Sequence, residues 1–231
     1  MGLRQEAESD LAHILENQDD FGVPIFVIAP DGKPVAVTGF SNDISQAIDP
    51  ETGQLDPNQL APLLDNKTRL VCCPHCSNVV GHINPIAEIA QMVHTAGAWL
   101  CVDGVSYAPH GLPDIASLDA DIYLFSAYKT YGPHLGMMVI RRALGELLPN
   151  QGHFFNASSL YKRFTPAGPD HAQIAASAGM ADYFDMLCDH HGAPDGIASE
   201  RGAFVHDLMR SHEIALLQQL LDALKDRNAV R

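Results

Sequence analysis

Three polar side chains of different chemistry follow three short apolar runs of this sequence. Asn78, Asp103 and Lys129 each stand shortly after a run of about five apolar residues, the length of a buried strand. Ligands of open α/β sheets bind beyond the carboxyl ends of the strands, so we expect these groups to converge at one sheet edge. An amide, a carboxylate and an amine suit a pyridine aldehyde. They offer a donor for its phenolic oxygen, an anion for its ring nitrogen and an amine for its carbon.

The elements that would position these groups alternate between strand and helix from Asp49 onward. Continuous apolar strands separated by helices are typical of a buried, largely parallel sheet, so the predicted fold class is α/β. Predicted strands cover 69–73, 98–102, 122–126 and 135–140. Predicted helices cover 56–64 (capped by Asp56 or Asn58), 85–96, 114–118, 170–187 and 201–226.

Three segments resemble motifs of the class V aminotransferases, and most closely their cysteine-desulfurase-like branch. They are 75–85 (HCSNVVGHINP), 102–110 (VDGVSYAPH) and 124–136 (LFSAYKTYGPHLG). The motifs come in the order and at the spacing of the family, and the similarity runs over 49–231. The resemblance implies the large domain of a pyridoxal-phosphate enzyme of fold type I, with a mainly parallel sheet flanked by helices.

The resemblance also implies roles for individual residues. Lys129 would form the Schiff base with pyridoxal 5'-phosphate and act as the catalytic residue. Asp103 would pair with the pyridine nitrogen, Asn78 would bind the phenolic oxygen or the substrate carboxylate, and Ser126 would bind the phosphate. The alternatives are a solvated surface lysine, a loop carboxylate, a turn amide and a strand-end hydroxyl.

Several positions depart from the family pattern. Ser106 stands where a Gln is common, and Tyr128 stands where a His is common before the lysine, so each offers the cofactor only a hydroxyl. Gly168 stands where many relatives place a phosphate-binding Thr. No segment of 1–48 resembles the phosphate loop, and Arg231 falls where a smaller C-terminal domain should begin. We therefore expect an incomplete, truncated site that binds cofactor weakly.

The first 48 residues have a different pattern. A helix over 3–15 and a hairpin of 23–29 and 34–39 indicate a small α+β appendage, too small for a core of its own. Residues 1–53 resemble small head–tail joining proteins of tailed phages. The alternative to an enzyme is therefore a non-catalytic fragment or fusion that serves as an assembly or binding module.

The amino-acid composition of the chain excludes some classes of binding partner. The chain has 14 Lys and Arg against 28 Asp and Glu, a net charge of −14. A surface of that sign repels phosphate backbones, so we expect no nucleic-acid partner. No apolar run reaches the length of a membrane span, and the N-terminus has no apolar signal core, so we expect a cytoplasmic protein.

The cysteine and histidine residues in and around the first motif could instead bind a metal ion. Cys73 and Cys76 have the spacing of metal ligands, and Cys72, His75 and His82 lie nearby. A second cysteine pair is missing, whereas structural zinc sites use four ligands with paired spacing, so we expect no metal.

The reaction and the assembly follow from the resemblance. An amino acid substrate would react through a quinonoid intermediate, by transamination, desulfuration or elimination. Cys188 is a poor nucleophile for desulfuration, because it lies in an apolar helical segment where a thiol stays protonated. Family sites form between two subunits, so we expect a homodimer that buries Phe154, Phe155, Tyr161 and the helix after Asp170.

Overall fold

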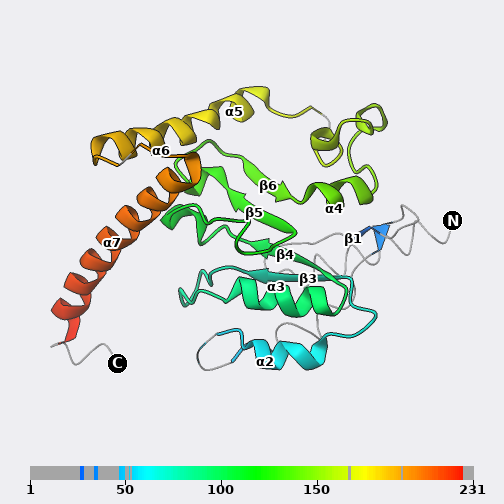
Figure 1. Cartoon of the computed structure of the whole chain (residues 1–231), viewed down its shortest axis with the longest axis horizontal. Coiled ribbons are helices and arrows are strands. Elements are labelled where there is room, and N and C mark those ends of the chain that lie inside the picture. Colours follow the sequence, from blue (N-terminus) through cyan, green and yellow to red (C-terminus); the bar gives the residue numbers. More distant parts are fainter. Residues whose placement is uncertain are drawn as a thin grey trace.

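The computed structural model describes residues 27–28, 34–35, 47–49, 52, 54–165, 168–193 and 195–225. Its centre is a four-stranded sheet in the order β3-β4-β5-β6 (Figure 1). The strands are β3 (Leu70–Pro74), β4 (Trp99–Asp103), β5 (Ile122–Ser126) and β6 (Gly136–Ile140). The first three run parallel and β6 runs antiparallel to β5. The predicted α/β class is confirmed, and each strand lies within one residue of its predicted run.

Helix α3 (Ile86–Thr95) covers one face of this sheet. It buries Ile86, Ile89 and Val93 in a cluster with the β4 residues Leu100 and Val102. The helix begins directly after Pro85, whose missing N–H is harmless at that position. It ends before Gly97, which adopts a φ of +76° that favours glycine. The helix predicted over 85–96 is confirmed.

The first helix of the main body, α2 (Pro57–Leu60), continues as the 3₁₀ helix η3 (Ala61–Leu63). The Asp56 side chain caps it by accepting a hydrogen bond from the Asn58 amide at 2.9 Å. Asp56, rather than Asn58, is therefore the N-cap.

Two helix predictions are wrong in detail. Residues 114–118 form turns, because the Asp114 side chain binds the amides of Ala116 and Ser117 and Asp119 then adopts a φ of +57°. The single helix predicted over 170–187 is divided at Ser177 into α5 (His171–Ala176) and α6 (Ala178–His190). The Ser177 hydroxyl donates to the Gln173 carbonyl at 3.0 Å, a bond that often bends helices.

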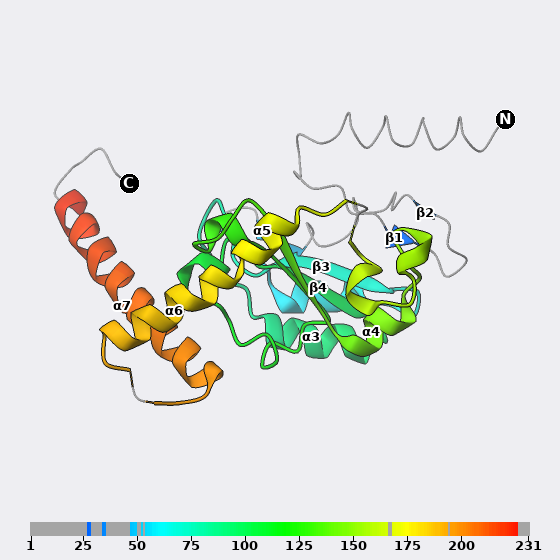
Figure 2. The ribbon, with the colours of Figure 1, turned by 90° about the horizontal axis from the view of Figure 1, so that it is seen from above.

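Helix α7 (Ala198–Lys225) extends away from the sheet in both views (Figures 1 and 2). Its first half packs on the body, where Val205 is buried and His206 lies against Gly111. Its second half exposes the apolar side chains of Ile214, Leu217 and Leu221. Within the described part of the chain, no helix combines the length and apolarity needed to cross a membrane.

The remaining elements connect these layers. Helix α4 (Arg142–Leu147) follows β6, and the 3₁₀ helices η6 (Phe154–Asn156) and η7 (Leu160–Lys162) lie in the connection to α5. Near the N-terminus, β1 (Val27–Ile28) pairs antiparallel with β2 (Pro34–Val35) in a separate two-stranded sheet. The two strands fall within the predicted hairpin, whereas the helix predicted over 3–15 lies outside the described residues.

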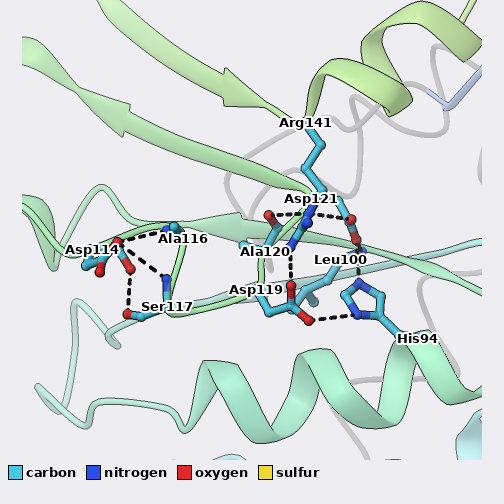
Figure 3. Close-up of polar contacts among 9 residues, drawn as sticks. All are labelled: His94, Leu100, Asp114, Ala116, Ser117, Asp119, Ala120, Asp121 and Arg141. Carbon is cyan, nitrogen blue, oxygen red and sulfur yellow. Dashed lines mark hydrogen bonds and ion pairs between the residues drawn. The ribbon is translucent and has the colours of Figure 1, made fainter.

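A polar network joins the elements at the amino-terminal edge of the parallel strands (Figure 3). Asp121, only 2% exposed, accepts a hydrogen bond from the Leu100 amide at 2.7 Å. One of its oxygens lies 2.8 Å from Nε2 of His94, and the other lies 3.1 Å from Nε of Arg141. Asp119 contacts both His94 and Arg141. This network ties four elements together, since His94 belongs to α3, Leu100 to β4, Asp121 directly precedes β5 and Arg141 directly follows β6.

Candidate functional site

The segment after β3 forms a tight loop that presents Asn78. An isolated bridge pairs Cys76 with Ile83, and the Ser77 hydroxyl accepts hydrogen bonds from the amides of Val79 and Val80, both at 3.3 Å. These bonds close the loop, so Asn78 lies exposed at its tip. At the base of the loop, the Asn84 amide group donates to the Pro74 carbonyl at 2.8 Å.

The segment after β4 turns at Asp103 and Gly104. The Asp103 carboxylate is exposed and accepts a hydrogen bond from the Val105 amide at 2.9 Å. Gly104 must be glycine, because a Cβ there would lie 2.2 Å from the Tyr123 ring. The chain then enters the 3₁₀ helix η4 (Ala108–His110), which leaves Ser106 half-buried.

The segment after β5 forms the 3₁₀ helix η5 (Ala127–Lys129). Ala127 is buried, whereas the two residues that follow it, Tyr128 and Lys129, face solvent. The ring of Tyr128 stacks on that of His134, with 4.5 Å between centroids. The buried Thr130 donates its hydroxyl to the Ser126 carbonyl at 2.9 Å, which holds the segment against the strand end.

A cavity of about 480 Å³ lies between these three segments. Three of the predicted site residues line it together: Asn78, Ser106 and Lys129. The wall is completed by Cys76, Ser77, Val79, Gly81, Val105, Pro109 and His110. Asp103, Ser126 and Tyr128 stand at the same edge of the sheet but are not among its lining residues. A second cavity of about 550 Å³, lined within residues 47–59, contains none of the predicted site residues.

A buried aromatic cluster supports the cavity and was not predicted from the sequence. His75 is 4% exposed, its ring stacks on Tyr107 at 3.7 Å, and its Nδ1 lies 2.8 Å from the Tyr123 hydroxyl. Burial lowers the pKa of His75 to about 4, so the ring is neutral at pH 7. The cluster therefore fastens the segments after β3 and β4 to β5 without adding a charge.

Two candidate ligands of the alternative metal site, Cys72 and Cys73, lie on opposite faces of the sheet. Cys73 belongs to the core cluster beside α3, whereas Cys72 points to the opposite face, since side chains alternate along a strand. His75 is engaged with Tyr107 and Tyr123. No group of three or more His, Cys, Asp or Glu side chains is placed to hold a metal ion within the described ranges.

The thiol that we expect to be a poor nucleophile for desulfuration, that of Cys188, is buried. Cys188 is 1% exposed on α6, and its thiol donates to the Arg201 carbonyl at 3.4 Å. Its surroundings therefore give a substrate no direct access to the sulfur.

Known proteins are similar to part of this chain. An aminotransferase-like protein of Gibberella zeae is 47% identical over 133 residues, which are 57% of this chain and 33% of that protein. A cysteine desulfurase of Dickeya dadantii is 34% identical over 185 residues, which are 78% of this chain and 43% of that protein. The chain thus spans less than half the length of these relatives.

Solved structures support the same fold. A cysteine desulfurase of Thermococcus onnurineus superposes with a TM-score of 0.54 at 18% identity, covering 76% of this chain and 43% of that chain. A NifS-like protein of Rickettsia africae gives the same TM-score at 20% identity, covering 77% and 44%. The family model described as Aminotransferase class-V matches residues 43–187. The chain therefore belongs to the class V aminotransferase family, as the three sequence motifs predict.

Proposed function

We propose that this chain carries the cofactor site of a pyridoxal-phosphate-dependent enzyme that acts on an amino acid. The observation that carries the proposal is the cavity at the carboxyl edge of the sheet, where Lys129, Asn78 and Ser106 face one space. An amine, an amide and a hydroxyl from three different strand ends can bind an aldehyde, a phenolic oxygen and a phosphate. When bound, this cofactor acts as an electron sink that stabilises negative charge on the substrate.

The residues of the chain then have separate tasks. Lys129 is proposed to bind the aldehyde carbon covalently and to move a proton at its Nζ atom. Asn78 orients the phenolic oxygen or the substrate carboxylate. Asp103, held by the Val105 amide, would supply the anion for the ring nitrogen, although its side chain would have to turn toward the cavity. Ser126, Tyr128 and Ser106 would offer hydroxyl donors to the phosphate.

Phosphate affinity should be low in the chain by itself. A phosphate monoester carries close to two negative charges, and each charge-assisted hydrogen bond contributes on the order of 1.5–3 kcal/mol. The described residues around the cavity include one exposed cation, Lys129, which the proposal assigns to the aldehyde. We therefore expect the purified protein to be largely colourless until cofactor is added in excess.

Covalent trapping tests the proposal directly. The protein is incubated with excess pyridoxal phosphate, reduced with borohydride, digested and analysed by mass spectrometry. The expected result is one saturable adduct on the peptide that contains Lys129. Lys162→Ala serves as the matched control, because Lys162 is also exposed but lies in η7, outside the residues that line the cavity.

The outcome separates the enzyme from its alternative. Loss of the adduct in Lys129→Ala and its retention in Lys162→Ala support the enzyme. Equal labelling of many lysines, or none at any concentration, would favour the non-catalytic assembly or binding module.

The reaction is proposed to be a transfer or a lyase step on an amino acid. The names of the relatives, an aminotransferase-like protein and a cysteine desulfurase, supply the two candidates. Incubation with cysteine distinguishes them, because desulfuration releases alanine and reducible sulfur, whereas transamination leaves a keto acid. We further propose a cytoplasmic location for this activity.

The exposed aromatic residues of the long connection support a homodimer. Phe154, Phe155 and Tyr161 are 81%, 66% and 75% exposed, and Ile174 of α5 is 45% exposed. Large exposed apolar groups of this kind often mark interfaces. Light scattering should give twice the mass of one chain, and Phe155→Ser with Tyr161→Ser should shift it toward one chain.

A further inference from the structure

Two cysteines face each other across the first pair of strands. In the parallel register of β3 and β4, Cys72 is the direct partner of Cys101. Both side chains lie on the face opposite α3, since their neighbours Cys73 and Val102 belong to the core cluster beside that helix. All five cysteines of the chain are free thiols in the structure.

The register brings the two Cα atoms within reach of a disulfide. Neighbouring strands lie about 4.8 Å apart, and disulfides join Cα atoms roughly 4.4–6.8 Å apart. Cys73 is excluded as a partner of Cys101 because it points to the other face. Cys76 lies beyond the end of the strand, where its thiol contacts the Ser77 carbonyl.

The two thiols also differ in reactivity. Hydrogen bonding from the Cys101 thiol lowers the pKa of Cys72, against an opposing effect of burial, and the same contact raises the pKa of Cys101. Cys72 is half-buried, whereas Cys101 is buried. Cys72 is therefore the thiol that an external oxidant meets first, with Cys101 placed behind it to complete the reaction.

We infer that Cys72 and Cys101 form a reversible redox pair that takes a low-molecular-weight disulfide, such as glutathione disulfide, as its oxidant. The Cys72 thiolate attacks one sulfur of the oxidant, forms a mixed disulfide and releases one thiolate. The Cys101 thiol then gives its proton to the released thiolate through solvent, and its sulfur attacks the Cys72 sulfur and expels the second thiolate. In total, two protein thiols lose two electrons and two protons, and the oxidant is reduced to two thiols.

The crosslink would join the two strands that carry Asn78 and Asp103 at their ends. The inference does not depend on the proposed function, because neither thiol lines the cavity of Lys129.

Peptide mapping after controlled oxidation tests the pair. The full chain is equilibrated with glutathione and glutathione disulfide at several ratios, alkylated in denaturant, and digested with a protease that cuts after glutamate. Cleavage at Glu88 places Cys72 and Cys101 on different peptides. The expected product is one crosslinked pair of peptides, lighter by two hydrogen atoms and separated by dithiothreitol.

Variants of neighbouring cysteines make the assignment specific. Cys73→Ser is the matched control, adjacent in sequence but on the other face, and should crosslink as fully as the wild type. Cys72→Ser and Cys101→Ser should lose the crosslink, and Cys101→Ser should retain a mixed disulfide with glutathione. Alanine variants replace any serine variant whose circular dichroism shows that it has not folded. Persistence of the crosslink without Cys72, or complete alkylation of all five wild-type thiols at every ratio, would overturn the inference.

Discussion

The two edges of the sheet use charged residues in opposite ways. At the amino-terminal edge, the buried Asp121 contacts His94, Arg141 and the Leu100 amide (Figure 3). At the carboxyl edge, Lys129 and Asn78 are exposed, and no hydrogen bond or ion pair joins either side chain to another described residue. The amino-terminal edge satisfies its buried carboxylate internally, whereas the carboxyl edge leaves the side chains of Lys129 and Asn78 available.

This difference indicates that the charged residues of one edge stabilise the fold, whereas those of the other edge can react with a ligand. A buried carboxylate is tolerated only when partners compensate for its lost hydration, so the groups around Asp121 are committed to the fold. An amine that is to react with a ligand must not be occupied in this way. Substitutions at the carboxyl edge should therefore change activity, and substitutions at the amino-terminal edge should change the free energy of unfolding.

The largest expected effect is on catalysis and comes from the carboxyl edge. Lys129→Ala should abolish turnover of any amino acid substrate, because no other amine lines the cavity within the described chain. Its free energy of unfolding should change by no more than about 0.5 kcal/mol, since the side chain is exposed. Activity assays and urea unfolding on the same preparation measure both. Residual activity near that of the wild type would end the assignment of Lys129.

The largest expected effect on stability comes from the other edge. Asp121→Ala should lower the free energy of unfolding by about 3 kcal/mol, because it breaks the ion pair with Arg141 and the hydrogen bond with His94 and leaves the buried Leu100 amide without its acceptor. The control is Glu146→Gln, which removes an exposed pair with Arg142 and should cost no more than about 0.5 kcal/mol. Similar losses of unfolding free energy in Asp121→Ala and Glu146→Gln would show that the amino-terminal edge does not depend on its buried carboxylate.

The pH dependence of stability should report on His75. Burial lowers its folded pKa to about 4, against about 6.5 when unfolded, so the unfolded chain binds more protons between these values. The contribution is fully present above pH 6.5 and is lost as the pH falls to about 4, by roughly 2–3 kcal/mol. In the variant His75→Phe, which keeps a ring for Tyr107 but cannot titrate, this part of the slope should disappear. An unchanged slope would show that the pKa of His75 does not differ between the folded and unfolded chains.

The sequence was sufficient for the strands and for part of the site. Continuous apolar runs predict all four strands of the main sheet, and parallel strands bring the residues that follow them to one edge, which places Asn78, Ser106 and Lys129 together. His75 was not predicted as a support for the site, because its partner Tyr123 lies 48 residues away on another strand. The Asp121 network was missed for the same reason, since its partners belong to separate elements. The misplaced helix over 114–118 reflects local side-chain bonds that outweigh helical spacing.

The smallest expected effect on stability is at Asp103. Asp103→Asn preserves an oxygen that can accept from the Val105 amide, and the side chain is exposed, so the free energy of unfolding should change by no more than about 0.5 kcal/mol. The same variant should retain less pyridoxal phosphate, because the amide no longer supplies an anion for the ring nitrogen. Cofactor titration followed by absorbance, beside urea unfolding, measures the two effects separately. A loss of stability as large as that of Asp121→Ala would make Asp103 a structural residue, whereas unchanged cofactor retention would remove it from the proposed site.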